Sequence, residues 1–340
     1  MVNNQNIRVS VVMPVYNVSL FVREAIQSVL DQSLQEIELI LVNDGSTDGS
    51  ATICEDFCSK DNRIVYLSKQ NEGVSIARNL GLAHVRGEYV FFMDADDTID
   101  KDFLKTTYAI GEKEKSDIVV IGEYYYKRLL HVKALATWAL MIKNDFLQQY
   151  ADIRFPPHIQ PCEDGLFTHQ LLLMADRISF NRESVYHYRH HDAQNHLTNN
   201  NRNDVVLEQI PTWFKVLDDF YSRYRLQKSK AIELALFIEH EPFEFRYVGM
   251  QWTNAQKSYL FDLIHDYLEA KVLPYLSAQD KKRLSPLFVM FIHAERYTDF
   301  EDFRDKRERT GHFYLKLAKL IPLRGVKRKI IRKINKHYFA

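Results

Sequence analysis

Three carboxylates stand directly after an apolar run, at a spacing suited to metal binding. The segment Met93–Asp97, with the sequence M-D-A-D-D, follows Tyr89–Phe92, which predicts a buried strand. Carboxylates this close repel one another, and a divalent cation at the mouth of the strand would offset that repulsion. In an extended chain Asp94 and Asp96 point the same way, and Mg²⁺ and Mn²⁺ prefer carboxylate and phosphate oxygens. The pattern predicts a divalent-metal site, whereas the alternative is a solvated acidic turn.

A second acidic pair opens a predicted helix. Glu163 and Asp164 precede Gly165 and the apolar-rich segment Leu166–Leu172. A carboxylate in this position can act as a general base that removes a proton from an acceptor hydroxyl, and Asp164 is the candidate for that role. The alternative is that the pair only caps the helix.

Three further motifs fall where predicted strands end and helices begin. Pro14–Asn17 follows the first strand, where Tyr16 offers a flat face to a nucleobase. Asp44 ends the second strand ahead of a glycine, in a position to accept from a base N–H. A glycine-led helix carries Arg78 in its second turn, and a guanidinium there can fork onto a phosphate or a carboxylate. Taken singly, the three motifs are also consistent with a turn, a helix cap and a surface arginine.

A histidine-rich segment, Tyr186–His191, lies beyond the second acidic pair. A neutral imidazole from His187 would complete a metal site, and Arg189 or His191 would pair with phosphate. The alternative is a set of solvated histidines in a polar loop.

The elements that must position these residues alternate in type over the first 120 residues. Such alternation predicts an α/β fold with a mostly parallel, Rossmann-like central sheet covered on both faces. Ligands of such sheets bind at the carboxyl ends of the strands, where the motifs fall. We expect strands at 9–13, 37–42, 64–67, 89–93 and 118–121, and helices at 19–30, 50–58, 74–83 and 101–113.

Taken together, these motifs resemble the inverting glycosyltransferase family 2, which has the GT-A fold. The resemblance covers about residues 7–200 and is of the type found in bacterial cell-surface polysaccharide synthesis. It rests on six motifs in the family's order: P-x-Y-N, N-D-G-S-x-D, N-x-G-x-S-x-A-R-N, D-A-D-D, E-D and Y-x-Y-R. Six matched motifs in order are far more specific than any one of them.

The resemblance implies a role for each matched position. Asp96 and His187 would hold Mn²⁺ or Mg²⁺ on the donor diphosphate, and Asp164 would be the catalytic base. Uracil would lie among Pro14, Val15, Tyr16 and Asp44. Arg78 would contact the nucleotide, and Asp94 would contact the ribose. The expected nucleotide-sugar-binding residues are Pro14, Val15, Tyr16, Asp44, Arg78, Asp94 and Ala95.

The implied reaction moves a hexose or N-acetylhexosamine from a UDP-sugar to a hydroxyl of a glycan or glycolipid acceptor, with inversion at C1. The residues leave the donor sugar and the acceptor open. Trp138 is a candidate for the acceptor side, and the alternative is a core tryptophan. Two other functions compete with this one. A nucleotidyltransferase would need a glycine-rich basic loop after the first strand, where Pro14–Asn17 stands. A non-catalytic nucleotide-sugar-binding or partner-docking protein predicts damaged acidic motifs, yet these are present.

Composition narrows the class of protein further. The 45 basic and 45 acidic residues balance, which argues against a globally basic nucleic-acid binder. The three cysteines suit a reducing compartment. The start M-V-N-N-Q-N has no signal-peptide pattern, and no apolar run is long enough to span a bilayer. We therefore expect a cytoplasmic protein.

The second part of the chain changes character. Helical periodicity runs through 204–224, 228–246, 256–276 and 280–300 with almost no glycine. We expect a catalytic domain at 1–203 and a helical module at 204–340, whose helices would also serve for homo-oligomer formation.

The last 29 residues are basic. Residues 312–340 contain nine Lys or Arg and no Asp or Glu, and 325–338 predict a basic amphipathic helix. Such a helix suits an anionic membrane surface, which would place the protein peripherally at the inner face of the cell membrane. The alternative is a helix packed on the protein itself or on a second subunit.

Overall fold

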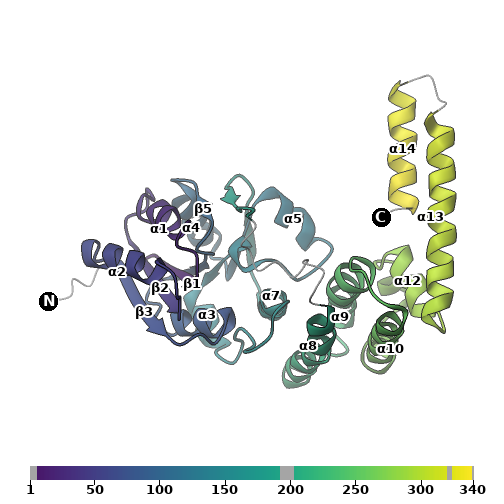
Figure 1. The fold of residues 1–340 in the computed structure, drawn as a ribbon, viewed down its shortest axis with the longest axis horizontal. Coiled ribbons are helices and arrows are strands. Elements are labelled where there is room, and N and C mark those ends of the chain that lie inside the picture. Colours follow the sequence, from purple (N-terminus) through teal and green to yellow (C-terminus); the bar gives the residue numbers. More distant parts are fainter. Residues whose placement is uncertain (1–5, 192–202, 320–323, 339–340) are drawn as a thin grey trace. The chain divides into compact units, whose positions relative to one another are not determined.

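The computed structural model describes residues 6–191, 203–319 and 324–338 of the 340-residue chain. The chain forms two compact units that divide after Leu226. Unit 1 holds all the strands found among the described residues, and unit 2 is helical there (Figure 1).

A seven-stranded sheet with the order β3-β2-β1-β4-β7-β6-β8 forms the centre of unit 1. Every strand pair is parallel except the two that β7 makes, with β4 and with β6. The expected strands and the mostly parallel sheet are therefore confirmed, and the antiparallel β7 is an addition. The strands are β1 (Val9–Val15), β2 (Ile37–Asp44), β3 (Ile64–Lys69), β4 (Tyr89–Phe92), β6 (Ile118–Ile121), β7 (Leu140–Lys143) and β8 (Ile178–Asn181).

Alternate residues of the strands face the two helix layers that cover the sheet (Figure 1). On one face Val11 and Val15 of β1 are buried in one core with Ala25 of α1. On the other face Val12 meets α3 at Gly81, where an added Cβ would lie 2.4 Å from the Val12 Cγ1 atom. The helices expected from the sequence are present, so strands and helices alternate as predicted.

Unit 1 also contains short elements around this frame. The pair β5 (Thr98–Ile99) and β9 (Tyr186–His187) forms a two-stranded antiparallel sheet. The helices are α1 (Val22–Leu30), α2 (Ser50–Lys60), α3 (Val74–Leu82), α4 (Phe103–Glu114), α5 (Glu123–Leu129), α6 (Asn144–Gln149), α7 (Glu163–Met174), α8 (Asn203–Arg223) and the short 3₁₀ helix η1 (Thr137–Ala139).

Helix α8 belongs to unit 1, so the division falls one helix beyond the expected boundary at 203/204. The reason is its packing on α7. The imidazole of His169 on α7, which is fully buried, lies 3.0 Å from the Tyr221 hydroxyl on α8. The apolar face of α8 is buried, including Trp213 at 0% exposure.

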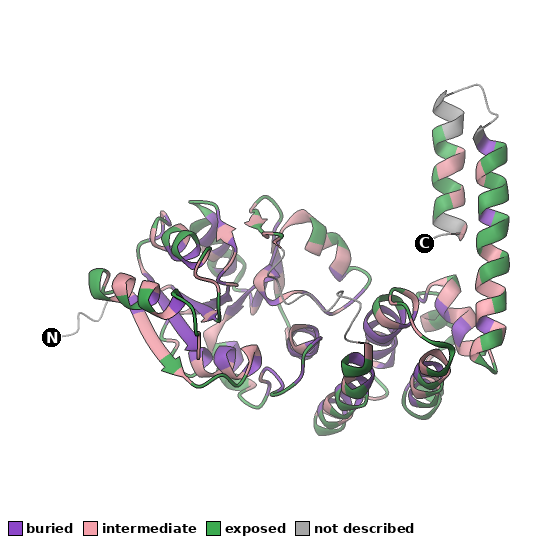
Figure 2. Ribbon diagram, in the orientation of Figure 1, coloured by how far each residue is buried: buried purple, intermediate pink, exposed green. Residues whose placement is uncertain are grey.

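Unit 2 packs aromatic side chains at its centre, where Phe243, Tyr247, Phe261, Phe291 and Phe300 contact one another. Figure 2 shows the buried side of its helices. Its elements are α9 (Ala231–Ile238), a π-helix (Glu239–Val248), α10 (Asn254–Lys271), a 3₁₀ turn (Leu273–Tyr275), α11 (Ala278–Lys281), α12 (Pro286–His293), α13 (Tyr297–Lys319) and α14 (Arg324–Tyr338).

The helical periodicity of 280–300 is divided among three helices rather than running through one. The segment holds the end of α11, all of α12 and the start of α13. Pro286 has no N–H to donate and stands in the first turn of α12, where the Ser285 side chain caps the Phe288 N–H. The chain leaves α12 at Ala294, whose backbone is extended.

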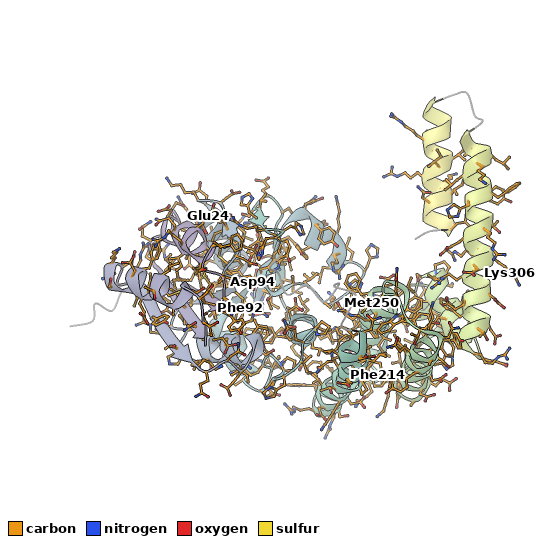
Figure 3. All side chains as sticks on the ribbon, viewed as in Figure 1. Glu24, Phe92, Asp94, Phe214, Met250 and Lys306 are labelled. Carbon is orange, nitrogen blue, oxygen red and sulfur yellow. The ribbon has the colours of Figure 1, made fainter. Side chains whose placement is uncertain are left out.

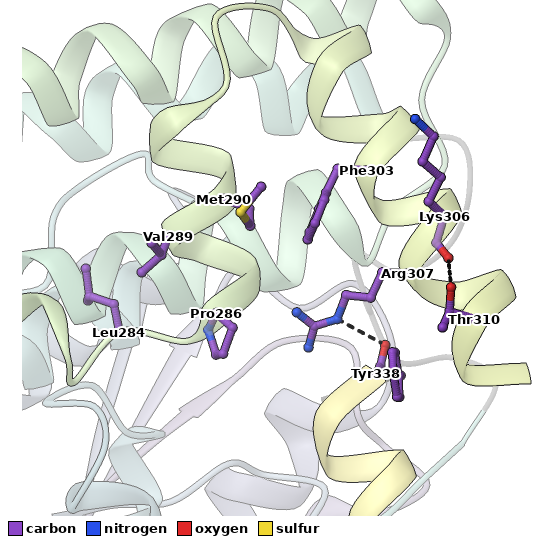
Figure 4. Close-up of a pocket in the computed structure, with 9 residues that line it drawn as sticks. All are labelled: Leu284, Pro286, Val289, Met290, Phe303, Lys306, Arg307, Thr310 and Tyr338. Carbon is purple, nitrogen blue, oxygen red and sulfur yellow. Dashed lines mark hydrogen bonds between the residues drawn. The ribbon is translucent and has the colours of Figure 1, made fainter. Parts of the chain in front are cut away.

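The last helices of unit 2 form a hairpin. An apolar cavity of about 720 Å³ lies where α12, α13 and the end of α14 meet (Figure 4). Its wall includes Met290, Phe303 and Tyr338, with Lys306 and Arg307 also lining it. Across the described ranges, every helix is too short or too polar to cross a lipid bilayer.

Burial of Glu239 predicts a pH dependence of stability. Burial raises the pKa of this carboxyl to about 7, although it accepts the Ser285 N–H at 2.7 Å. Because the folded pKa lies above the unfolded value, this stabilising contribution is complete at acid pH and is lost as the pH rises through about 7. Between pH 5 and pH 8, the ionisation of Glu239 should therefore lower the unfolding free energy of the wild type by roughly 2 kcal/mol. Glu239→Gln should lack this decrease.

Urea denaturation at the two pH values measures this effect. Asp262→Asn, at an exposed position on α10, is the control and should leave the pH dependence as in the wild type. An unchanged fall in Glu239→Gln would contradict the assignment.

Candidate active site

The predicted nucleotide-binding residues come from neighbouring strands and meet at one edge of the sheet. Pro14 and Val15 end β1 and lie in register with Val42 and Asn43 of β2, and Asp44 follows as the last residue of β2. β4 pairs with β1 on its other side and leads directly into Asp94, which Figure 3 labels beside Phe92. The carboxyl ends of parallel strands thus bring the β1, β2 and β4 motifs together.

Asp44 is buried and binds backbone rather than standing open at the strand tip. Its carboxylate accepts the N–H of Glu72 at 3.0 Å and the N–H of Gly73 at 2.8 Å, and pairs with Lys69. Gly73 has φ of +96°, a left-handed conformation that favours glycine, and α3 begins at the next residue. Asp44 therefore holds the entry to α3 at this edge of the sheet.

Arg78, on α3, is buried between two acidic elements. Its Nη2 donates to Asp94 Oδ1 at 2.9 Å, its Nη1 donates to Glu163 Oε1 at 3.2 Å, and its guanidinium lies 5.3 Å from the Phe155 ring centre. Burial raises the pKa of Glu163, and the charge of Arg78 opposes that shift. The carboxylate of Asp164 also acts electrostatically on the guanidinium. One cation thus joins the end of β4 to the start of α7.

Asp96 faces an imidazole, but not the one predicted as its metal-ligand partner. His191 Nε2 lies 2.9 Å from Asp96 Oδ2, and the His191 ring packs 4.2 Å from Phe21. His187 instead stands on β9, where its Nε2 lies 2.7 Å from Asp100 Oδ1 and half of its side chain is exposed. The role of His187 as a metal ligand stays a prediction, while the geometry brings His191 to Asp96.

The segment after β9 is held over the acidic motif by Arg189. Its backbone N–H donates to Asp97 Oδ1 at 2.7 Å, and its Nε donates to the Asp96 carbonyl oxygen at 2.9 Å. Its guanidinium pairs with Glu24 of α1, which Figure 3 labels, and lies 5.1 Å from the Phe21 ring centre. Burial raises the pKa of Asp97 to about 7. Sequence reasoning missed this use of Asp97 and Arg189, since the partners are about 92 residues apart.

Asp164 lies in the first turn of α7, one residue after Glu163, whose side chain is 12% exposed. The turn that starts this helix follows a cis bond between Gln160 and Pro161, and Cys162 takes a left-handed φ of +82°. Asp164 is half-buried, and its Oδ1 accepts the N–H of Gly165 at 2.8 Å. The predicted base therefore shares a helix start with the residue that binds Arg78.

Two of the predicted residues, Tyr16 and Ala95, make none of the polar contacts described above. Tyr16 is 45% exposed at the end of β1, and Ala95 is buried between the two aspartates. Within the parts of the chain that the structure describes, no three His, Cys, Asp or Glu side chains come together as a ready cation site.

Residues 10–166 match the family model described as Glycosyl transferase family 2. This part of the chain is a glycosyl transferase family 2 domain. The matched range begins in β1 and ends just after Asp164, so it includes every predicted site residue except His187.

Two bacterial relatives illustrate the family 2 match. "Glycosyltransferase GlyA" of Streptococcus pneumoniae serotype 4 is 31% identical over 215 residues, which are 54% of this chain and 30% of GlyA. "Poly(ribitol-phosphate) beta-N-acetylglucosaminyltransferase TarS" of Staphylococcus aureus is 25% identical over 343 residues, or 90% of this chain and 56% of TarS. The chain thus spans about a third of the length of GlyA and somewhat over half of the length of TarS.

Solved structures show the fold. TarS residues 1–349 in complex with UDP-GlcNAc give a TM-score of 0.69 at 20% identity, covering 88% of this chain and 92% of that one. A mannosyltransferase from Pyrobaculum calidifontis in complex with GDP-Man and Mn²⁺ gives 0.51 at 15% identity, covering 97% and 84%. The family 2 domain therefore has the GT-A fold, as expected from the sequence.

The Arg78 bridge predicts a specific stability pattern. Replacing Arg78 by Gln leaves two acidic side chains facing each other without their cation, which should lower the unfolding free energy by about 3 kcal/mol. Adding Glu163→Gln removes one of the two charges, so the double variant should be more stable than Arg78→Gln alone. Urea denaturation of both variants measures the difference.

Lys60→Gln serves as the control, because its ion pair with Asp56 is exposed and should change stability by less than about 1 kcal/mol. A double variant no more stable than Arg78→Gln would show that the bridge does not carry the stabilisation.

Proposed function

We propose that the protein is an inverting glycosyltransferase that moves a hexose or N-acetylhexosamine from a UDP-sugar to a hydroxyl of a glycan or glycolipid. The observation that carries this proposal is the buried Arg78 bridge in a family 2 domain. It holds the end of β4, where a donor diphosphate would bind, against the start of α7, where Asp164 stands. The relative named as a β-N-acetylglucosaminyltransferase supports a UDP-sugar donor.

The nucleotide would bind across β1, β2 and β4. Val15 and Tyr16 follow Pro14 toward the edge of the sheet, and Tyr16 is exposed enough to stack on uracil. Asp44 accepts three hydrogen bonds within the protein, and a carboxylate has about four acceptor sites. The remaining site would accept the uracil N–H, while Asp94 would accept from the ribose.

The donor atoms beside Asp96 fit a divalent cation. An imidazole nitrogen of His191 and a carboxylate oxygen of Asp96 lie 2.9 Å apart, which is a ligand pair suited to Mn²⁺, and Mg²⁺ would rely more on the carboxylates. His187 remains the alternative nitrogen ligand. When bound, the cation would offset the negative charge that develops on the departing UDP. Arg78 and the peptide dipoles of α3 lie at the same edge and would act in the same sense.

Asp164 would act as the general base. The acceptor oxygen attacks C1 of the donor sugar from the face opposite the UDP oxygen, and the C1–O bond to UDP breaks with its electron pair on UDP. Asp164 takes the hydroxyl proton as the new bond forms, so the anomeric configuration inverts. Glu163 is not available for this task, because Arg78 holds its carboxylate in the buried bridge.

Donor turnover tests this proposal. UDP release should be measured with a panel of UDP-sugars, with Mn²⁺ and with EDTA, on the wild type and on Asp96→Ala. We expect slow metal-dependent release from one donor, and its loss in the variant. Asp164→Asn should lower transfer by 10²-fold or more, since general-base catalysis contributes about 10²–10⁴-fold, and should leave UDP binding nearly unchanged.

Asp176→Asn is the matched control, because this exposed aspartate follows the opposite end of α7. Transfer that persists in Asp164→Asn would exclude Asp164 as the base. A wild type that neither turns over a donor nor binds UDP would support the non-catalytic alternative.

The basic end of unit 2 would bring the enzyme to a lipid-linked acceptor at the membrane. Ile330, Ile331 and Ile334 of α14 are half-buried, and Tyr338 packs 5.7 Å from Tyr314 of α13. The apolar stripe of α14 thus faces α13, which agrees with the alternative that this helix packs on the protein itself. The basic face stays exposed at Arg328, Lys329, Arg332 and Lys333, and α13 exposes Phe313, Tyr314 and Leu317. Basic residues near anionic lipid contribute about 1 kcal/mol each.

Flotation with vesicles tests the membrane proposal. The full chain should float with phosphatidylserine-containing vesicles and not with phosphatidylcholine alone, since the attraction is electrostatic. Neutralising the four exposed α14 residues to Gln should abolish flotation.

A control neutralises four exposed basic residues elsewhere in unit 2, at Lys271, Lys281, Lys282 and Arg283, and should float as the wild type does. Equal flotation of both four-residue variants would argue against a role for α14.

A further inference from the structure

A run of aromatic rings extends through unit 1 from Asp94. The Tyr186 hydroxyl accepts the Asp94 N–H at 3.1 Å, and Trp138 stacks on Tyr186 with ring centres 4.3 Å apart and planes 11° apart. Tyr125 meets Trp138 edge to face at 5.0 Å, and Tyr188 lies nearly parallel to Trp138 at 6.0 Å. The rings come from α5, from η1 and from the segment at β9.

The same cluster is tied to the start of α7, where the proposed base lies. The backbone N–H of Leu135, just before η1, donates to Thr168 Oγ1 at 3.1 Å, and that hydroxyl donates back to the Leu135 carbonyl at 2.7 Å. Thr168 is one helical turn along α7 from Asp164. Burial raises the pKa of the Tyr125 hydroxyl, and the negative charge of Asp164 adds to the shift, as expected for neighbours.

Two polar groups of this cluster have no hydrogen-bond partner among the described residues: the indole N–H of Trp138 and the hydroxyl of Tyr125. Tyrosine and tryptophan side chains that are packed in this way usually satisfy their polar atoms within the protein. Trp252, for comparison, donates its indole N–H to the Arg246 carbonyl at 2.8 Å. Trp138 and Tyr125 are each half-buried, so the two groups remain accessible to a ligand.

We propose that Trp138 and Tyr125 form the subsite for a pyranose ring of the acceptor, next to the base Asp164. This inference rests on the proposed function. A pyranose ring has an apolar face of C–H groups that packs on an aromatic ring, and hydroxyl oxygens at its edge that accept hydrogen bonds. The half-buried rings provide the packing surface, and the indole N–H and the phenol O–H provide the donors. The free hydroxyl of the same ring would then face Asp164.

Tryptophan fluorescence tests binding without requiring turnover. The full chain, with UDP and Mn²⁺, is titrated with methyl pyranosides of glucose, galactose and N-acetylglucosamine, and with ribitol as an acyclic polyol. The chain has three tryptophans, so the signal is assigned by substitution. We expect a saturable change with at least one pyranoside, kept in Trp252→Phe and lost in Trp138→Phe. A change that survives in Trp138→Phe, a change with ribitol only, or no change at all would overturn the proposal.

Kinetics with the pyranoside that binds separate a subsite from a structural role. Trp138→Leu and Tyr125→Phe should each raise the KM for the acceptor by about threefold to tenfold, with the KM for the UDP-sugar within about twofold. A parallel rise in both KM values would show that the substitutions disturb the whole site and would overturn the subsite. Failure of the proposed function looks different, because the wild type would then release no UDP from any UDP-sugar.

Discussion

The guanidinium of Arg78 is the charge on which the arrangement of the site depends. It is buried, and it donates to Asp94 at the end of β4 and to Glu163 at the start of α7. A buried cation is tolerated only when its partners are anionic and well placed, and the same holds for the two carboxylates. Each of the three groups therefore needs the others, which holds α3, β4 and α7 at fixed positions. Asp164 follows Glu163 and is placed by that constraint.

A second set of contacts is made by Asp96 and Asp97, at the end of the acidic motif that follows β4. Asp97 binds the Arg189 backbone, Arg189 pairs with Glu24, and His191 reaches Asp96. These contacts bring the segment after β9 across the end of β4. The proposed metal site and the proposed acceptor subsite are thus built on one piece of chain, since Tyr186 of the preceding strand β9 stacks on Trp138. Donor and acceptor binding would share a common support.

Unit 2 is held together by apolar packing rather than by a charged bridge. Aromatic side chains pack on one another at its centre. At its end is a helical hairpin in which the apolar stripe of α14 faces α13. The basic residues Arg328, Lys329, Arg332 and Lys333 of α14 are exposed, and the final 29 residues contain no Asp or Glu. The proposed attachment to an anionic membrane surface rests on this charge pattern.

The sequence by itself determined the alternating strands and helices, the edge of the sheet at which Asp44, Arg78 and Asp94 meet, and the acidic start of α7. These features depend on hydrophobic periodicity and on motifs a few residues long, which are local. Tertiary structure alone decided that Arg78 binds Glu163, that His191 rather than His187 faces Asp96, and that α8 packs with unit 1. Those outcomes depend on pairings between residues 52 to 95 positions apart, and side-chain packing selects among partners that the linear pattern leaves equivalent.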